Sequence, residues 1–343
     1  MSEQTLLMDS APAIPDEEPA WGAVFSMTLG VFGLVTAEFL PASLLTPMAA
    51  DLGVTEGAAG QAVTATAAMA LVSSLLIAPA TRRLDRRRVL LGFSFLLILS
   101  NLLVAIAPSL PVLLGARLLL GVALGGFWAM STAVVMRLVP ATLMARALSI
   151  LFSGVSAATV FAAPVGSYLG GVLGWRDVML MAAALGALAL VVQFITLPSL
   201  ASSGSARLST LVKVAMRPGI GIALVAVALV FTGHFALFTY VRPYIEIVTQ
   251  AGISAVSGIL LGFGMANFFG AYLGGMIIAR SLRLTLVIMP LVMGIVLSQP
   301  RAGRSWGMRQ WSRSGVSPLG PCRWRGRPGS LARFLTRRRA AAA

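Results

Sequence analysis

Residues 60–107 decide the fold. They read GQAVTATAAMALVSSLLIAPA, then the loop TRRLDRRR at 81–88, then VLLGFSFLLILSNLLVAIA. Each apolar run has about 20 residues, enough for a helix to cross a hydrocarbon core of roughly 30 Å, and the loop between them carries five arginines. Two membrane helices joined by a basic loop are therefore predicted here.

The same pattern continues in both directions and predicts an all-α integral membrane protein. The predicted spans lie near 22–49, 60–80, 89–107, 110–136, 146–170, 178–197, 219–242 and 254–279, with a short ninth span near 284–298. The composition agrees, because 58% hydrophobic and 11% charged residues leave too little polar surface to cover a soluble fold of 343 residues.

Basic residues collect in every second gap between the spans. They lie in the loop 81–88, at 137–146, in 198–218 and at 280–283. By the positive-inside rule these gaps and the N-terminus are expected in the cytoplasm. Residues 1–20 hold five acids and three prolines without a basic region, so they predict a disordered cytosolic tail rather than a signal peptide.

The spans divide into two groups. Residues 21–197 would form a six-helix bundle, 198–218 a cytoplasmic linker, and 219–298 an incomplete second bundle. Outer loops beginning at Asp51 and Gln250 both lead into Gly/Ala-rich helices, as a parallel six-span repeat would give.

The segment 299–343 differs from the rest of the chain. It contains 11 arginines but no lysine, aspartate or glutamate. A genuine basic arm would bind anionic lipid or nucleic acid, but after nine spans it would lie on the side where arginine is depleted. We therefore expect a frame-shifted tail and no nucleic-acid partner. Cys322 is the only cysteine, so no disulfide, metal site or cofactor is predicted.

Two charged residues lie deep inside predicted spans, where charge is costly and persists mainly when paired or facing water. Glu38 is about eight residues, and Arg117 about seven, from the outer end of its helix, so both lie roughly 10–12 Å deep. Equal depth permits an ion pair, either a permanent structural one or one that releases Glu38 as a proton carrier. His234 in mid-span is a further candidate for proton coupling or a neutral packing residue.

An intramembrane enzyme is an alternative of a different class. Gly154-Val155-Ser156 together with His234 superficially matches a serine nucleophile and its base. No third orienting group or oxyanion hole accompanies them, so no catalytic residue is predicted. Small residues instead recur every four positions from Gly154 through Ala158, Ala162 and Gly166 to Gly170, a stripe on which another helix can lie closely.

Several motifs resemble the major facilitator superfamily. The loop Leu84 to Arg88 resembles its conformational latch, with Asp85, Arg86 and Arg87 as the latch residues. Arg117 followed by Gly121 and Gly125 is similar to the fourth-helix motif. The antiporter motif of the fifth helix is matched by Gly154, Pro164, Gly166 and Gly170.

Longer strings resemble bacterial purine ribonucleoside efflux pumps, among them AEFLP at 37–41, ALGGFWAMS at 123–131 and FTYVRP at 238–243. The resemblance implies a twelve-helix fold, of which about nine helices are present, in the bacterial inner membrane. It implies a monomeric proton antiporter that exports inosine, guanosine and analogues. The substrate-binding candidates are Phe127, Trp128, Tyr240, Arg242 and Asn267. Export of a sugar or drug, and a truncated protein that does not transport, remain the alternatives.

Overall fold

The computed structural model describes residues 19–201 and 219–281, with residues 213, 216–217, 287–288, 291–292 and 294–295 described separately. The helices treated below belong to one compact unit that ends at Leu286. Four predicted segments lie wholly or mostly outside the described residues: the tail 1–20 except for residues 19 and 20, the linker 198–218, the ninth span and the tail 299–343.

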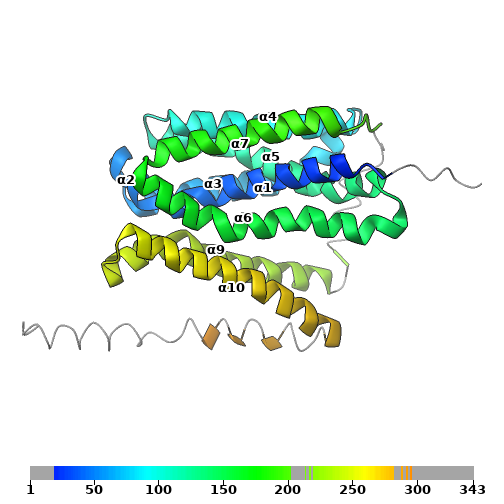
Figure 1. Ribbon diagram of the computed structural model, residues 1–343. Coiled ribbons are helices and arrows are strands. Elements are labelled where there is room, and N and C mark those ends of the chain that lie inside the picture. The colour runs from blue at the N-terminus through cyan, green and yellow to red at the C-terminus, as the bar shows by residue number, and fades with distance from the viewer. Residues whose placement is uncertain are drawn as a thin grey trace, which may run out of the picture. The chain divides into compact units, whose positions relative to one another are not determined.

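Eight helices of the described part are long and apolar enough to cross a membrane. They are α1 (Trp21–Ser43), α3 (Glu56–Ala80), α4 (Arg86–Ala105), α5 (Leu110–Leu138), α6 (Met144–Val172), α7 (Trp175–Thr196), α9 (Ile220–Thr249) and α10 (Ile253–Arg280) (Figure 1). A short helix α2 (Leu45–Leu52) follows α1, and a single 3₁₀ turn η1 (Ala141–Leu143) precedes α6. The all-helical fold and its first eight spans are confirmed.

The first span differs from the prediction of one helix over 22–49. It is interrupted at Leu44, whose φ of −111° and ψ of 10° are not helical, and resumes as α2. Pro41 lies in the last turn of α1 and Pro47 in the first turn of α2, so two backbone N–H donors are missing around the break. The seventh span also runs further than predicted, to Thr249.

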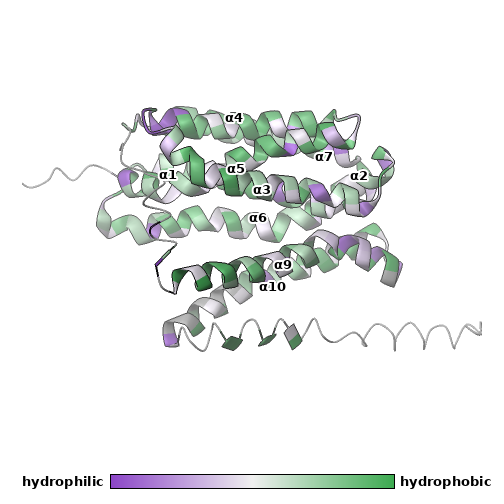
Figure 2. Ribbon diagram, turned by 180° about the vertical axis from the view of Figure 1, so that it is seen from behind, coloured by the Kyte–Doolittle hydropathy of each residue, from purple (hydrophilic) through white to green (hydrophobic). Residues whose placement is uncertain are grey.

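Polar caps mark where the helices begin and end. The Thr55 hydroxyl accepts the N–H of Ala58 at the start of α3 (3.2 Å), and the Asp85 carboxylate accepts the N–H of Arg87 at the start of α4 (2.8 Å). Gly53 ends α2 with φ of 64°, a left-handed conformation that glycine adopts without steric cost. Figure 2 shows hydrophilic residues gathered at the first turn of α4, while the helix bodies are apolar.

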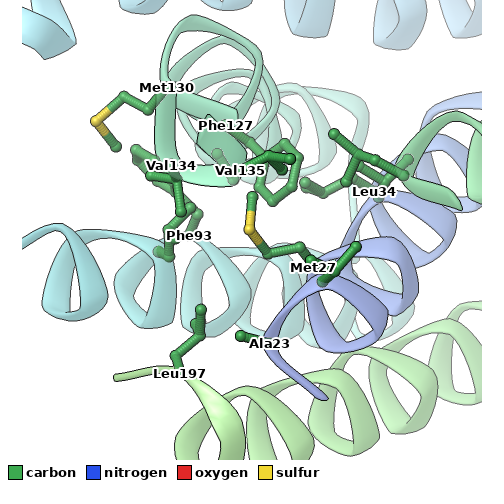
Figure 3. Packing of buried hydrophobic residues seen from close by; sticks show 14 of the residues in the cluster. Ala23, Met27, Leu34, Phe93, Phe127, Met130, Val134, Val135 and Leu197 are labelled. Carbon is green, nitrogen blue, oxygen red and sulfur yellow. The ribbon is translucent and has the colours of Figure 1, made fainter. Parts of the chain in front are cut away.

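Large apolar side chains fill the space between α1, α4 and α5. Met27, Leu34, Phe93, Phe127 and Val135 are all nearly or fully buried in one cluster (Figure 3). Their burial fixes which faces of these three helices turn inward, and so where the polar residues of the same helices can lie.

The predicted stripe of small residues on α6 does lie against another helix, namely α1. A Cβ atom placed at Gly154 would come 2.6 Å from the carbonyl oxygen of Thr28, so the two backbones approach too closely for a side chain. Gly121 on α5 meets the backbone of α3 in the same way, with the carbonyl oxygen of Thr66 at 2.5 Å. These close approaches set the levels at which residues of neighbouring helices face each other.

The Gly154→Val substitution is therefore expected to destabilise the protein. Three added carbons would push α1 and α6 apart, and overpacking of this kind costs about 1–3 kcal/mol. Gly115→Ala on α5 is the control, because no atom lies within 4 Å of a Cβ there. Thermal unfolding of the purified protein should show a lower midpoint for the first variant only. Equal midpoints would show that the α1–α6 approach can relax without cost.

Candidate functional site

Two carbonyl groups in α1 lack their normal helical partners. In a continuous helix the N–H of residue 41 would bind the carbonyl of Ala37, and that of residue 47 would bind the carbonyl of Ser43. Both donors are prolines and have no N–H. A carbonyl left unpaired in an apolar setting is costly, so each needs a donor from elsewhere in the molecule.

Arg117 of α5 supplies the first donor. Its Nη1 atom donates to the carbonyl oxygen of Ala37 at 2.9 Å, and the side chain is completely buried. Ala37 precedes Glu38, so the prediction that Arg117 and Glu38 lie at the same depth is confirmed. They form no direct ion pair, since the described residues contain only Asp51–Arg176 and Arg242–Glu246 pairs within 4.0 Å.

Arg242 of α9 supplies the second donor. Its Nη1 atom donates to the carbonyl oxygen of Ser43, and its Nε atom donates to Glu246 at 2.8 Å. The second carboxylate oxygen of Glu246 accepts the Thr46 hydroxyl of α2 at 2.6 Å. The Arg242 side chain is only 5% exposed. This group, which we call the α9 clasp, ties α9 to both sides of the break in α1.

The predicted antiporter motif faces the same break. A Cβ atom at Gly166 would lie 2.5 Å from a methyl group of Leu40 and 2.8 Å from the Ser43 hydroxyl, and Gly170 faces Leu44. Pro164 is buried within α6, two residues before Gly166. The small residues of α6 thus leave room for the interrupted part of α1.

His234 lies in an aromatic cluster that joins three helices. Its ring is 6.3 Å from those of Phe238 and Phe263, and Phe238 is 5.0 Å from Phe39 of α1. Phe39 follows Glu38 directly, so the aromatic cluster begins one residue from the buried carboxyl group. Half-buried His234 makes no hydrogen bond among the described residues, and its ring is held by the neighbouring aromatic rings.

The five substrate-binding candidates fall into two groups. Trp128 and Tyr240 are 37% and 42% exposed, and Asn267 is exposed as well. Trp128 stacks on Phe152 with ring centroids 6.0 Å apart. Phe127 is 2% exposed and belongs to the hydrophobic core, and Arg242 is occupied by the α9 clasp. The exposed group has side chains available to a ligand.

A cavity of about 300 Å³ lies between α1, α6 and α7. Its lining is apolar apart from Thr36 and includes Phe32, Phe161, Met181 and Leu185. Specific sites for polar ligands need several converging polar groups. The cavity lacks them, so it does not bring any of the predicted substrate residues together.

The predicted latch residues hold together the helix ends near residue 85. Asp85 accepts the backbone N–H groups of Arg87 (2.8 Å) and Leu200 (3.0 Å) and the hydroxyl of Ser199. The hydrogen bond from Ser199, with those from Leu200 and Arg87 and the charge of Arg88, holds the pKa of the Asp85 carboxyl below its usual range.

The arginines of the latch act in the same region. Arg86 donates to the Thr81 hydroxyl at 3.0 Å and contacts the Met130 sulfur of α5 at 3.2 Å. Arg87 donates to the carbonyl oxygen of Phe194 at 2.6 Å, near the end of α7. The latch therefore joins α3, α4, α5 and α7.

Sequence reasoning missed several residues of the site. Pro41 and Pro47 could have predicted the two unpaired carbonyl groups, because each proline leaves the carbonyl four residues earlier without its helical donor. Thr46 and Glu246 lie 200 positions apart, and nothing in the sequence pairs them. Asn101, a polar residue in the middle of a predicted span, is completely buried and was passed over.

Comparisons with known proteins agree with this architecture. The family model described as "Major Facilitator Superfamily" matches residues 27–301. The purine ribonucleoside efflux pump NepI of Escherichia coli K12 is 45% identical over 277 residues, which cover 81% of this chain and 70% of that protein. NepI of Salmonella paratyphi B is 44% identical over the same length, with the same coverage.

Solved structures share the fold at low identity. A bacterial homologue of the human lysosomal transporter Spinster superposes with a TM-score of 0.67 and 17% identity, covering 79% of this chain and 64% of that one. The D-xylose–proton symporter gives a TM-score of 0.56 and 17% identity, covering 76% of this chain and 68% of that one. All of these relatives are transporters.

Removing the Asp85 carboxylate is expected to lower stability in a pH-dependent way. Asp85→Ala should cost about 1 kcal/mol at pH 7, as loss of an N-cap does. Because the pKa of Asp85 is lowered in the folded state, its stabilisation is present above the unfolded pKa of about 4 and is lost as pH falls below it. Thermal unfolding at pH 7 and pH 3 measures this. A difference that is the same at both pH values would contradict the assignment.

Breaking the α9 clasp should uncover the break in α1. Ser43 is 2% exposed, so a Ser43→Cys reporter in a Cys322→Ser background should react slowly with a water-soluble maleimide. Adding Arg242→Gln should speed the reaction at least about tenfold, because removing one partner of a buried charge pair costs about 3–5 kcal/mol.

Arg176→Gln is the matched control for the clasp. It breaks the Arg176–Asp51 ion pair of 2.9 Å, which joins α7 to α2 and does not involve α9. In the Arg176→Gln variant the Ser43→Cys reporter should react with the maleimide as slowly as it does without either arginine substitution. Equal rates in the Arg242 and Arg176 variants would show that the clasp does not cover Ser43.

Proposed function

This chain belongs to the major facilitator superfamily, and from that premise we propose that it exports purine ribonucleosides, such as inosine and guanosine, in exchange for protons. The observation that carries the proposal is the 45% identity over 277 residues to a purine ribonucleoside efflux pump. That stretch takes in most of the described helices. The protein would act as a transporter and not as an enzyme, as a monomer in the bacterial inner membrane with its N-terminus in the cytoplasm.

Glu38 is the proposed proton carrier. It is half-buried at the level of Arg117, and the interiors of α3, α4, α6 and α7 hold no other Asp, Glu, Lys, Arg or His. The corresponding residues of α9 are His234, in the aromatic cluster, and Arg242 and Glu246, which are paired in the α9 clasp. Glu38 forms no direct ion pair in this structure, the arrangement expected when it holds its proton, and Arg117 is bound to Ala37.

Purine recognition is assigned to the exposed candidates. Trp128 and Tyr240 offer aromatic faces on which a purine ring can stack, and the Asn267 amide can both donate and accept hydrogen bonds. Phe127 would support Trp128 from the core, since their rings meet edge to face at 6.5 Å. Arg242 would act indirectly, by holding α9 against α1.

Side-chain contacts hold helices together at both ends of the bundle, an arrangement that suits alternating access. The Asp85 latch would close helix ends on the cytoplasmic side, where the arginine-rich loop is expected. The α9 clasp would close the opposite side, because α1 runs from one side to the other between them. Opening one end while the other stays tied is how transporters of this kind move a solute around a central site.

Uptake into inverted membrane vesicles tests the function. Vesicles from cells expressing the full chain should accumulate labelled inosine when their interior is acidic, and should accumulate neither xylose nor a cationic dye. Uptake of the sugar or dye in place of inosine would favour the alternative exporter. No uptake of any of the three, with normal membrane insertion, would favour a protein that does not transport.

Glu38→Gln should abolish the response to the pH gradient. The carboxamide does not ionise near neutral pH and so cannot carry a proton, and gradient-driven inosine accumulation should fall at least about tenfold, to the level of empty vesicles. Glu56→Gln is the matched control, because Glu56 lies in the first turn of α3, away from Arg117. Proton-driven uptake that survives in the Glu38 variant would reject Glu38 as the carrier.

A further inference from the structure

Arg117 has more hydrogen-bond capacity than its one contact uses. Its Nη1 atom binds the Ala37 carbonyl, but Nε and Nη2 have no partner among the described residues. The side chain has 0% exposure, so bulk water does not supply one. Buried guanidinium nitrogens are normally paired, and two unpaired ones indicate that a further polar group belongs beside them.

Asn101 of α4 is also buried without hydrogen-bond partners. It is also 0% exposed, and neither its Oδ1 acceptor nor its Nδ2 donor has a partner in the described part of the chain. A buried amide with both ends unpaired is rare in native proteins. A polar residue at this position in an otherwise apolar helix needs a reason.

A contact between α4 and α5 places the two residues close in height. The hydroxyl of Ser100 donates to the carbonyl oxygen of Ala116 at 2.7 Å. Asn101 and Arg117 are the next residues on these two helices. Because the helices are antiparallel, Asn101 and Arg117 lie on opposite sides of this bond, about 3 Å apart in height.

A contact between α4 and α1 gives the same level independently. A Cβ atom at Gly33 of α1 would lie 3.2 Å from a methyl group of Leu97 of α4. One helical turn beyond Gly33 and Leu97 are Ala37 and Asn101. The carbonyl that Arg117 binds thus lies at the height of Asn101.

We propose that Asn101 is a positioning residue for Glu38. Together with Arg117 it holds one internal water, which binds the guanidinium nitrogens while Glu38 is protonated. One water can accept from Arg117 and donate to Oδ1 of Asn101, within the two to four bonds that buried waters make. When Glu38 ionises, its carboxylate takes the place of this water and binds Arg117. Asn101 thereby sets how strongly Arg117 attracts Glu38.

The inference rests on the proposed proton carrier but can be tested without transport. Dicyclohexylcarbodiimide reacts with protonated carboxyl groups in apolar surroundings, so its labelling of Glu38 in the purified full chain, read by mass spectrometry against pH, reports when Glu38 holds its proton. Asn101→Leu removes the competing acceptor. The labelling midpoint should move by about one pH unit to lower pH, because Arg117 then binds the Glu38 carboxylate alone.

Asn101→Asp should move the midpoint the other way, by about one unit to higher pH, because the new carboxylate binds Arg117 and repels Glu38. Ser131→Ala, at a buried position of α5 whose hydroxyl bonds to the Trp128 carbonyl of its own helix, should leave it unchanged. Should the leucine variant fail to fold, Asn101→Ala carries the same prediction. Unchanged midpoints, or shifts in one direction for both substitutions, would overturn the proposal. Opposite shifts in a chain that moves no inosine would uphold it and reject the transport function.

Discussion

The carbonyl groups that Pro41 and Pro47 leave unpaired constrain much of this structure. In an apolar environment each must find a donor, and two arginines from distant parts of the sequence supply them. Arg117 reaches Ala37 from α5, and Arg242 reaches Ser43 from α9. Both arginines are nearly or fully buried. The cost of burying each guanidinium is offset by its hydrogen bond to a carbonyl group that would otherwise be unpaired. Through Arg242, the break in α1 is one of the places where the two groups of helices are joined.

Close packing makes this arrangement possible. Because glycines on α6 and α5 let backbones of α1 and α3 approach, residues on neighbouring helices meet at defined heights. Glu38, Arg117 and Asn101 share one such height, set by contacts of Gly33, Leu97 and Ser100. A carboxyl group that is half-buried near a guanidinium, with no ion pair between them in this structure, can join that guanidinium when it ionises and leave it when it takes up a proton. That is the physical basis for assigning proton coupling to this level of the helices.

Much of this could be predicted from the sequence, for reasons that can be named. Apolar runs of membrane-spanning length predicted α3 to α10 within a few residues, except that α9 runs to Thr249. Counting residues from the helix ends predicted the common depth of Glu38 and Arg117. The interruption at Leu44 was missed because hydropathy does not register proline. The pairing of Thr46 with Glu246 depends on how helices from the two groups meet, which no local pattern encodes. Phe127 and Trp128 are adjacent in sequence, yet only the packing shows that one is core and the other exposed.

The central claim is that solute movement and proton movement are coupled in this chain. The most direct measurement uses the purified full chain in liposomes containing a pH-sensitive dye, with no gradient imposed at the start. Adding inosine to one side should drive protons the opposite way and change the internal pH, while adding xylose should not. An internal pH that stays constant while labelled inosine crosses the membrane would contradict proton antiport.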